Sequence, residues 1–169
     1  VKYLPSPENR IPVKAKNVED DAEIVLSAQT DATASALVFK TVADPYAGKL
    51  TLFRMFTGSI KGDSSIYNTS KDASERIGQL YMLQGKNQIP VTEISVGDIG
   101  TVAKLKQTVT GDTFSGPGEK IVFPPISFPL PVFSRALLPK TRADEEKISQ
   151  ALQRLTEEDP TLKVERNSQ

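Results

Sequence analysis

The sequence predicts a mainly β protein, in which a small antiparallel barrel is followed by a proline-rich linker and a truncated α+β piece. Short strand-like segments separated by turn residues recur from Ser35 to Phe114, a pattern typical of small barrels and sandwiches. After them, one segment with helical periodicity stands between two strand-like stretches. We therefore expect four parts: a linker and loop (1–30), the barrel (31–118), the linker (119–131) and the α+β part (132–169).

Composition excludes several classes of site. The 169 residues carry 21 basic and 21 acidic side chains, a balance that argues against a polybasic nucleic-acid-binding arm. Cysteine and histidine are absent, which excludes disulfides, thiolate zinc sites and every histidine-dependent catalytic triad. The apolar runs are far shorter than the ~20 residues of a membrane helix. These features suit a cytoplasmic protein. The first residue, Val1, and the last, directly after a strand-like stretch, indicate a fragment of a longer protein.

The first thirty residues show no clear periodicity. Val1 to Arg10 is predicted to be extended, because Pro5 and Pro7 forbid a continuous helix. Val13 to Gln29 is acidic in its middle and is predicted to be a surface loop.

The barrel is expected to be organised around residues 43–65. A strand from Ser35 to Val42 leads into a turn over Asp44 to Gly48, where proline restricts φ and glycine allows positive φ. Lys49 to Phe56 is predicted to be a strand that turns into a second strand, Ser65 to Thr69, as a hairpin-like unit.

Four further strand-like segments complete the predicted barrel. The segments are Arg76 to Leu83, Ile89 to Val91 with Ile94, Gly100 to Leu105, and Thr108 to Phe114. Pro90 lies in the second of them and cannot donate a backbone hydrogen bond, so this strand is expected at a sheet edge.

Beyond the prolines of residues 115–131, a β-α-β order is predicted. Val132 to Leu138 and Thr161 to Glu165 alternate as strands do. Thr141 is the expected N-cap of the helix between them, and Pro160 ends it. Ile148, Leu152 and Leu155 form an apolar stripe that is expected to be core.

Few residues carry chemistry. No phosphate-binding GxxxxGK[ST] loop occurs. The acidic clusters Asp20-Asp21 and Glu157-Glu158-Asp159 are best explained as a loop surface and a helix end. We therefore expect no catalytic, cofactor-binding or metal-binding residues in this segment. Basic side chains near turns are the remaining candidates, as contacts to RNA phosphates. They are Arg54, Lys61, Lys71 and Arg76, with Lys49 and Lys86 as further members of a basic rim.

The stretch ADPYAGKLTLFRMFTGSI resembles the opening block of the second domain of translation elongation factor G. Further blocks follow in that family's order: Ser74 to Ile77, Val96 to Ile99, Thr110 to Thr113, Phe128 to Val132, Pro139 to Asp144, and Leu155 to Thr161. Even Leu4 to Pro7 is similar to the linker that leaves the family's GTPase domain. Leu130 and Leu138 depart from the family pattern, which has glutamate at both positions.

The resemblance implies a translation-factor barrel (domain II) followed by the start of a ferredoxin-like domain III. It also implies contact with the ribosome, with small-subunit rRNA and with the GTPase domain of the same chain, and no contact with membrane or DNA. GTP and Mg²⁺ would bind in that absent GTPase domain, so this segment is expected to be no enzyme by itself.

Two alternatives stay open on the sequence. The departures from the family pattern suit a divergent paralogue, such as a segment of a ribosome-protection GTPase. The barrel pattern also suits a free-standing module that binds RNA or protein. An enzyme acting on its own is disfavoured, because no nucleophile–base pair can be assembled from these residues.

Overall fold

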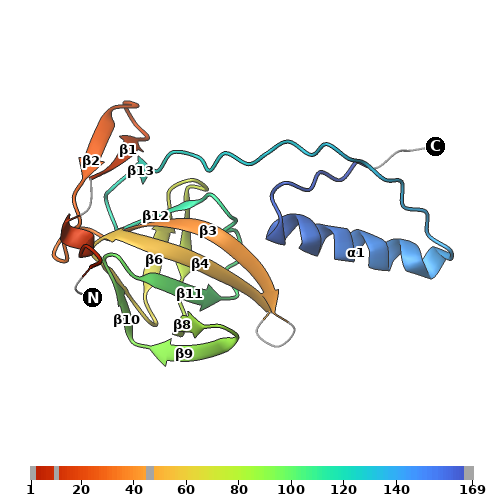
Figure 1. The fold of residues 1–169 in the computed structure, drawn as a ribbon, viewed down its shortest axis with the longest axis horizontal. Helices are drawn as coiled ribbons and strands as arrows, with labels where there is room; N and C mark the ends of the chain where they lie inside the picture. Colours follow the sequence, from red (N-terminus) through yellow and green to blue (C-terminus); the bar gives the residue numbers. More distant parts are fainter. Residues whose placement is uncertain (1–2, 10–11, 45–47, 166–169) are drawn as a thin grey trace.

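A computed structural model describes residues 3–9, 12–44 and 48–165, and it confirms the mainly β fold (Figure 1). The largest sheet has eight antiparallel strands in the order β7-β6-β12-β3-β4-β11-β8-β9, and β5 pairs with β10. The elements of this part are β3 (Ser35–Asp44), β4 (Gly48–Thr57), β5 (Ser59–Lys61), β6 (Ser65–Asn68), β7 (Ala73–Arg76), β8 (Leu80–Gln84), β9 (Asn87–Val91), β10 (Glu93–Ser95), β11 (Ile99–Ala103) and β12 (Thr113–Ser115).

The core of the barrel lies inside this sheet. Phe53, Met55 and Phe114 are fully buried, and the rings of Phe53 and Phe114 meet edge to face at 5.7 Å between centroids. Burial of one such side chain stabilises a fold by about 1.5–3 kcal/mol. The alternation of β4 therefore holds as predicted, with Thr51, Phe53 and Met55 on the buried face.

The hairpin-like unit expected from residues 49–56 and 65–69 is not formed. β4 pairs with β3 and β11, whereas β6 pairs with β7 and β12. The reason lies at Gly58, whose backbone N–H donates to the Gln29 carbonyl at 2.8 Å and whose φ is +62°. The chain thus leaves β4 for β5 and β10 instead of folding back. Of the turn predicted over 44–48, residues 45–47 lie outside the described residues, and Asp44 stands opposite Gly48.

The surface loop expected over Val13 to Gln29 is wrong, because a hairpin forms there. β1 (Val13–Asn17) pairs with β2 (Glu23–Leu26) and with β13 (Ile121–Val122). Of the acidic residues that suggested a loop, Glu19, Asp20 and Asp21 lie in the turn, where Asp21 has a φ of 56°, and Glu23 begins β2. The apolar residues on its inner face pack on the outside of the barrel, in a cluster made by Ala15, Ile121, Phe123, Val13, Ile24, Leu26, Leu37 and Phe56.

Of the remaining strand predictions, some hold with shifted bounds and two are largely wrong. The continuous strand expected from Arg76 to Leu83 is broken, since β7 ends at Arg76 and β8 begins at Leu80. The last strand piece is only Thr113–Ser115, because residues 104–112 form a loop. Pro90 lies in β9, the edge strand at one end of the large sheet, as its missing N–H predicts. A short 3-10 helix, η1 (Pro7–Asn9), precedes β1.

The helix is confirmed, and the strands expected beside it are not formed. α1 (Arg142–Glu158) follows the N-cap Thr141 and ends before Pro160. The described residues 132–138 and 161–165 contain no strand, because no neighbouring strand offers them backbone hydrogen bonds. The apolar stripe of α1 is not core either, since none of the helix's residues is buried. No helix in the described parts of the chain is long and apolar enough to cross a membrane.

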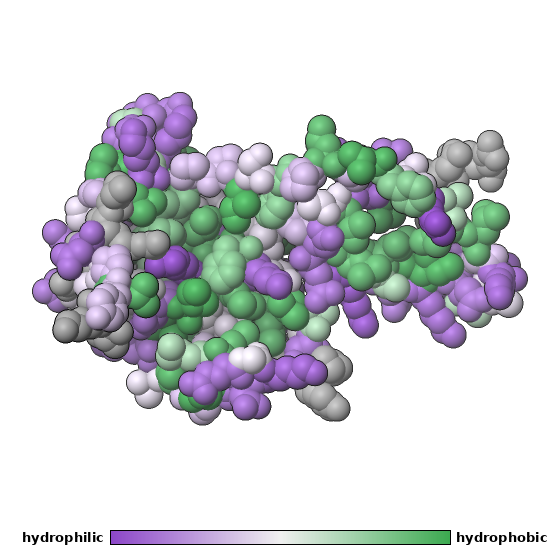
Figure 2. Space-filling model, viewed as in Figure 1, coloured by the Kyte–Doolittle hydropathy of each residue, from purple (hydrophilic) through white to green (hydrophobic). Residues whose placement is uncertain are grey.

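Apolar side chains consequently gather on the surface of this second part. Val132 is 100% exposed and Leu138 87% exposed, and Leu155 of α1 is 47% exposed. Figure 2 shows apolar side chains over the region formed by α1 and the extended chain that leads to it.

Candidate functional site

The four predicted rRNA-contacting cations lie on separate parts of the barrel. Arg54 is half-buried on β4, opposite Leu37 of β3 and Ile99 of β11. It lines a shallow pocket with Pro7, Pro12 and Met55. β12 and β3 separate β4 from β6, so Arg54 lies three strand spacings, roughly 14 Å along a flat sheet, from the β6–β7 pair.

The other three candidates are exposed around β6 and β7. Arg76 stands opposite Ser65 at one end of this strand pair, and Lys61 ends β5 just before it. Lys71 lies in the connection between β6 and β7, at the opposite end. Lys61 and Arg76 are thus neighbours in the topology, whereas Lys71 and Arg54 are not part of the same group. The single basic rim considered from the sequence stays a prediction, and Lys61 and Arg76 are the pair of its members that the topology places together.

Glu75 is a structurally central residue that the sequence analysis missed. Its side chain is 5% exposed, and its carboxylate accepts hydrogen bonds from the backbone amides of Lys106 (3.2 Å), Gln107 (2.7 Å) and Thr108 (3.0 Å). The Thr108 hydroxyl donates a fourth, at 3.1 Å. Burial alone would raise the pKa of Glu75, but these donors outweigh it, so the pKa lies below its ordinary value.

A second buried group continues this network. Asn68 donates through Nδ2 to the Thr108 hydroxyl (3.0 Å) and to Asp112 Oδ2 (2.9 Å). Asp112 Oδ2 also accepts from the Val109 amide at 2.9 Å. The loop of residues 104–112 is therefore pinned to β6 and β7 by side chains with satisfied hydrogen bonds. The signal in the sequence was the block Ser74 to Ile77, which contains Glu75.

The pinned loop adds two lysines to the candidates. Lys104 and Lys106 are exposed on it, and the Lys104 amide donates to the Lys49 carbonyl at 2.9 Å. Exposed lysines on a rigid loop can contact RNA phosphates with little loss of conformational entropy. Lys49 itself is largely covered, because its ammonium group faces α1.

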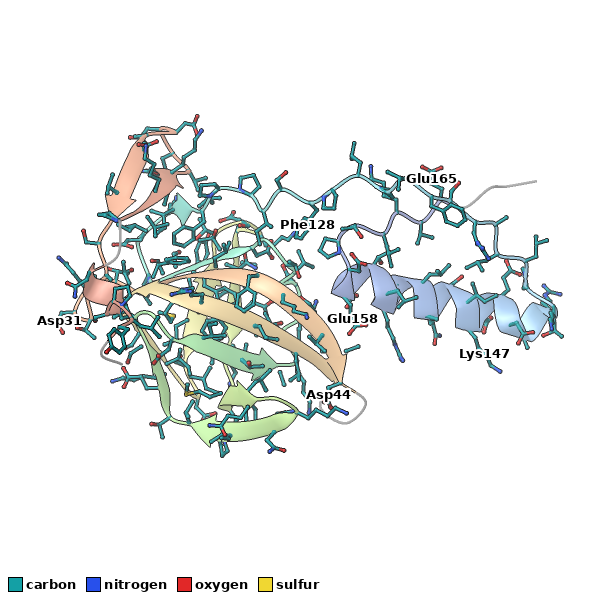
Figure 3. The ribbon with its side chains drawn as sticks, in the orientation of Figure 1. Asp31, Asp44, Phe128, Lys147, Glu158 and Glu165 are labelled. Atoms are coloured by element: carbon teal, nitrogen blue, oxygen red, sulfur yellow. The ribbon has the colours of Figure 1, made fainter. Side chains whose placement is uncertain are left out.

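α1 approaches the barrel at the β3–β4 pair. Thr41, Lys49, Gln153 and Glu157 line an open cleft of about 510 Å³ between the helix and these strands. Figure 3 shows Glu158 at the end of α1 that meets the barrel, beside Asp44, and Lys147 farther along the helix. Within the described residues, no three acidic side chains lie close enough to hold a metal ion.

Comparison with known proteins gives consistent findings. The family model "Elongation factor G domain 2" matches residues 33–116, and "Elongation Factor G, domain III" matches residues 128–169. The chain is 40% identical, over all 169 residues, to elongation factor G of Chlamydia caviae, and it spans 24% of that protein's length. A crystal structure of a Thermus thermophilus protein is similar with a TM-score of 0.70 and 31% identity, over 80% of this chain and 21% of that one. The chain therefore belongs to the elongation factor G family, and it matches that family's second and third domains.

Proposed function

We propose that this chain is the non-catalytic, ribosome-binding segment of an elongation factor G-like translational GTPase that acts in the cytoplasm. The observation that carries the proposal is the 40% identity to an elongation factor G over the whole chain, with both domain models in the family's order. Since the chain spans 24% of that relative, GTP and Mg²⁺ chemistry is assigned here to a separate GTPase domain of the parent protein. Movement of rigid domains would couple its nucleotide state to ribosome contact.

The proposed partner surface is the small-subunit rRNA. Lys61 and Arg76 are exposed and adjacent in the topology, and Lys104 and Lys106 are held on a pinned loop. Lys71 and Arg54 are kept as further proposed contacts. Positively charged side chains on rigid elements are suited to bind phosphates, since phosphate contacts supply most of the affinity for RNA.

The test is cosedimentation of the 169-residue chain with purified ribosomes and with each subunit, from about 50 to 300 mM KCl. We expect binding to the small subunit that weakens steeply with salt. The triple variant Lys61→Ala, Lys71→Ala, Arg76→Ala should bind about tenfold more weakly and with a smaller salt slope. A matched variant, Lys14→Ala, Lys16→Ala, Lys147→Ala, removes the same charge elsewhere on the chain and should bind like the unchanged protein.

Three outcomes would contradict the proposal. Absence of ribosome binding at the lowest salt would exclude ribosome recognition by this segment. Equal affinity for unrelated structured RNA would favour a free-standing RNA-binding barrel instead. Equal weakening by both triple variants would reject the assigned contact surface.

A further inference from the structure

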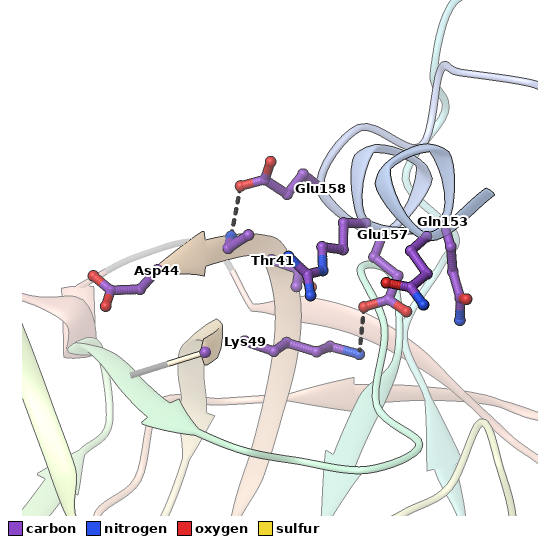
Figure 4. A pocket seen from close by; sticks show the side chains of 10 residues that line it. Thr41, Asp44, Lys49, Gln153, Glu157 and Glu158 are labelled. Atoms are coloured by element: carbon purple, nitrogen blue, oxygen red, sulfur yellow. Dashed lines mark hydrogen bonds and ion pairs between the residues drawn. The ribbon is translucent and has the colours of Figure 1, made fainter. Parts of the chain in front are cut away.

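Two stretches that lie 115 residues apart meet where α1 approaches the barrel. The Ala43 backbone N–H donates a hydrogen bond to Glu158 Oε1 at 2.5 Å. Glu157 Oε2 lies 3.8 Å from Lys49 Nζ. Figure 4 shows both interactions, made by successive residues of the last helical turn with the paired strands β3 and β4. The acidic run of α1 thus has partners outside its own helix.

Helix electrostatics alone does not explain this acidic run. The carboxyl end of a helix carries partial negative charge, which disfavours carboxylates there and favours cations. α1 has Asp144 and Glu145 in its first turn, where they are favourable, but no basic residue in its last turn. Glu157 and Glu158 therefore disfavour the isolated helix. A cation and a backbone N–H supplied by the barrel offset that effect.

The barrel side also needs a partner at this place. β12 pairs with β3 only from Ser35 to Leu37, so the far half of β3 lacks a strand on that side. A backbone N–H on an unpaired edge needs an acceptor, and proteins commonly cover such edges with a helix or loop. Glu158 provides the acceptor for Ala43.

The contact is polar rather than apolar. No residue of α1 is buried, and the cleft beside the contact is lined by Gln150, Gln153 and Arg154 of the helix. The Lys49 side chain is 19% exposed and that of Glu157 37% exposed, so water and salt reach the ion pair. Polar contacts of this kind are weak and reversible, because solvent competes for each partner.

We propose that Glu157 and Glu158 form a polar latch that holds α1 against the β3–β4 pair, so that docked and undocked arrangements of the two domains interconvert. Rising ionic strength shifts this balance toward the undocked arrangement. The latch goes beyond the proposed function and is a property of the chain alone. It is tested without ribosomes, so its failure would leave the proposed function untouched.

The test is a spin-label distance measurement on the 169-residue chain. The chain has no cysteine, so cysteines introduced by Ser149→Cys on α1 and Gln84→Cys on β8 are the only labelling sites. We expect one narrow distance distribution at low salt that broadens at about 1 M salt. Lys49→Glu should lower the docked-to-undocked ratio about twofold to fivefold, and Glu158→Ala about tenfold.

Charge exchange separates a latch from a general structural effect. Adding Glu157→Lys to Lys49→Glu recreates the ion pair with reversed charges and should restore the narrow distribution. Glu146→Gln, at the other end of α1, is the matched control and should leave it unchanged. Circular dichroism melting of each variant confirms that the barrel stays folded. At low salt, a broad distribution in the unchanged chain, or a narrow one in Lys49→Glu and Glu158→Ala, would overturn the proposal.

Discussion

Removal of the Glu75 carboxylate should destabilise the barrel more than any other single change of a polar residue described above. Glu75→Ala deletes the acceptor of three backbone amides and one hydroxyl, at 2.7–3.2 Å, in a place where the side chain is 5% exposed. A hydrogen bond to a charged group contributes about 1.5–3 kcal/mol, and the contributions do not add fully. Since the loop of residues 104–112 can open to water, we expect a loss of about 3–4 kcal/mol in the free energy of unfolding.

Glu75→Gln provides a sharper version of the same perturbation. The glutamine oxygen can still accept from Gln107 and Thr108, but its amide nitrogen would face the Lys106 N–H, donor against donor. We expect a loss of about 1.5–3 kcal/mol. Asn68 and Asp112 keep their own hydrogen bonds, so the rest of the network remains as an internal reference.

Lowering the pH should reduce the stabilisation that the Glu75 carboxylate gives to the fold. The pKa of Glu75 is lower in the folded chain than its ordinary value of 4.5. The carboxylate therefore stabilises the fold above that ordinary value, and the contribution is lost as the pH falls through and below it. The difference in unfolding free energy between the unchanged chain and Glu75→Gln should shrink from about pH 7 to about pH 3.

Urea unfolding followed by circular dichroism measures these differences, because the chain has no tryptophan. Amide hydrogen exchange at residues 106–108 should accelerate in both variants. A Glu75→Ala chain within about 0.5 kcal/mol of the unchanged one, with protected amides at 106–108, would refute the role of Glu75 as the anchor of this loop.

Four further changes test the fold. Gly58→Ala should cost at least about 2 kcal/mol of unfolding free energy, because φ is +62° and the new Cβ would clash with the Ala32 carbonyl oxygen. Its control is Gly85→Ala, which has a φ of +61° but open space around the new Cβ and should cost only about 1 kcal/mol in the same urea experiment. Phe53→Ala should cost about 3–5 kcal/mol, and an unchanged melting temperature would contradict its place in the core. Leu138→Ser should change unfolding by less than about 0.5 kcal/mol and reduce self-association in light scattering, because this leucine is 87% exposed.

Local sequence signals predicted local structure well. Thr141 and Pro160 marked the two ends of α1, the alternation of β4 marked its buried face, and Pro90 marked an edge strand. Each of these depends on the chemistry of one residue or on a short period, so it could be predicted without knowledge of distant partners.

Pairing between distant strands could not be predicted in the same way. The expectation that β4 and β6 form a hairpin failed, because Gly58 bonds back to residue 29 and turns the chain away. The hairpin of β1 and β2 was not predicted, because the acidic residues near Asp21 suggested a surface loop. They form the turn of this hairpin, and apolar residues beside them pack on the barrel. The candidate site was harder to predict than the strands, because Glu75 binds backbone amides of a loop that lies 31–33 residues later in the chain.

By itself, the sequence determined the family, the mainly β class and the position of the helix. Each of these depends on signals within short stretches of chain: the order of short blocks, period-two alternation and helix-terminal residues. Only the tertiary structure decided which strands are neighbours and what the acidic end of α1 contacts. The physical reason is that a carboxylate shows its role only through its partners. Glu75 binds a loop from within the barrel, and Glu158 binds a strand edge 115 residues away.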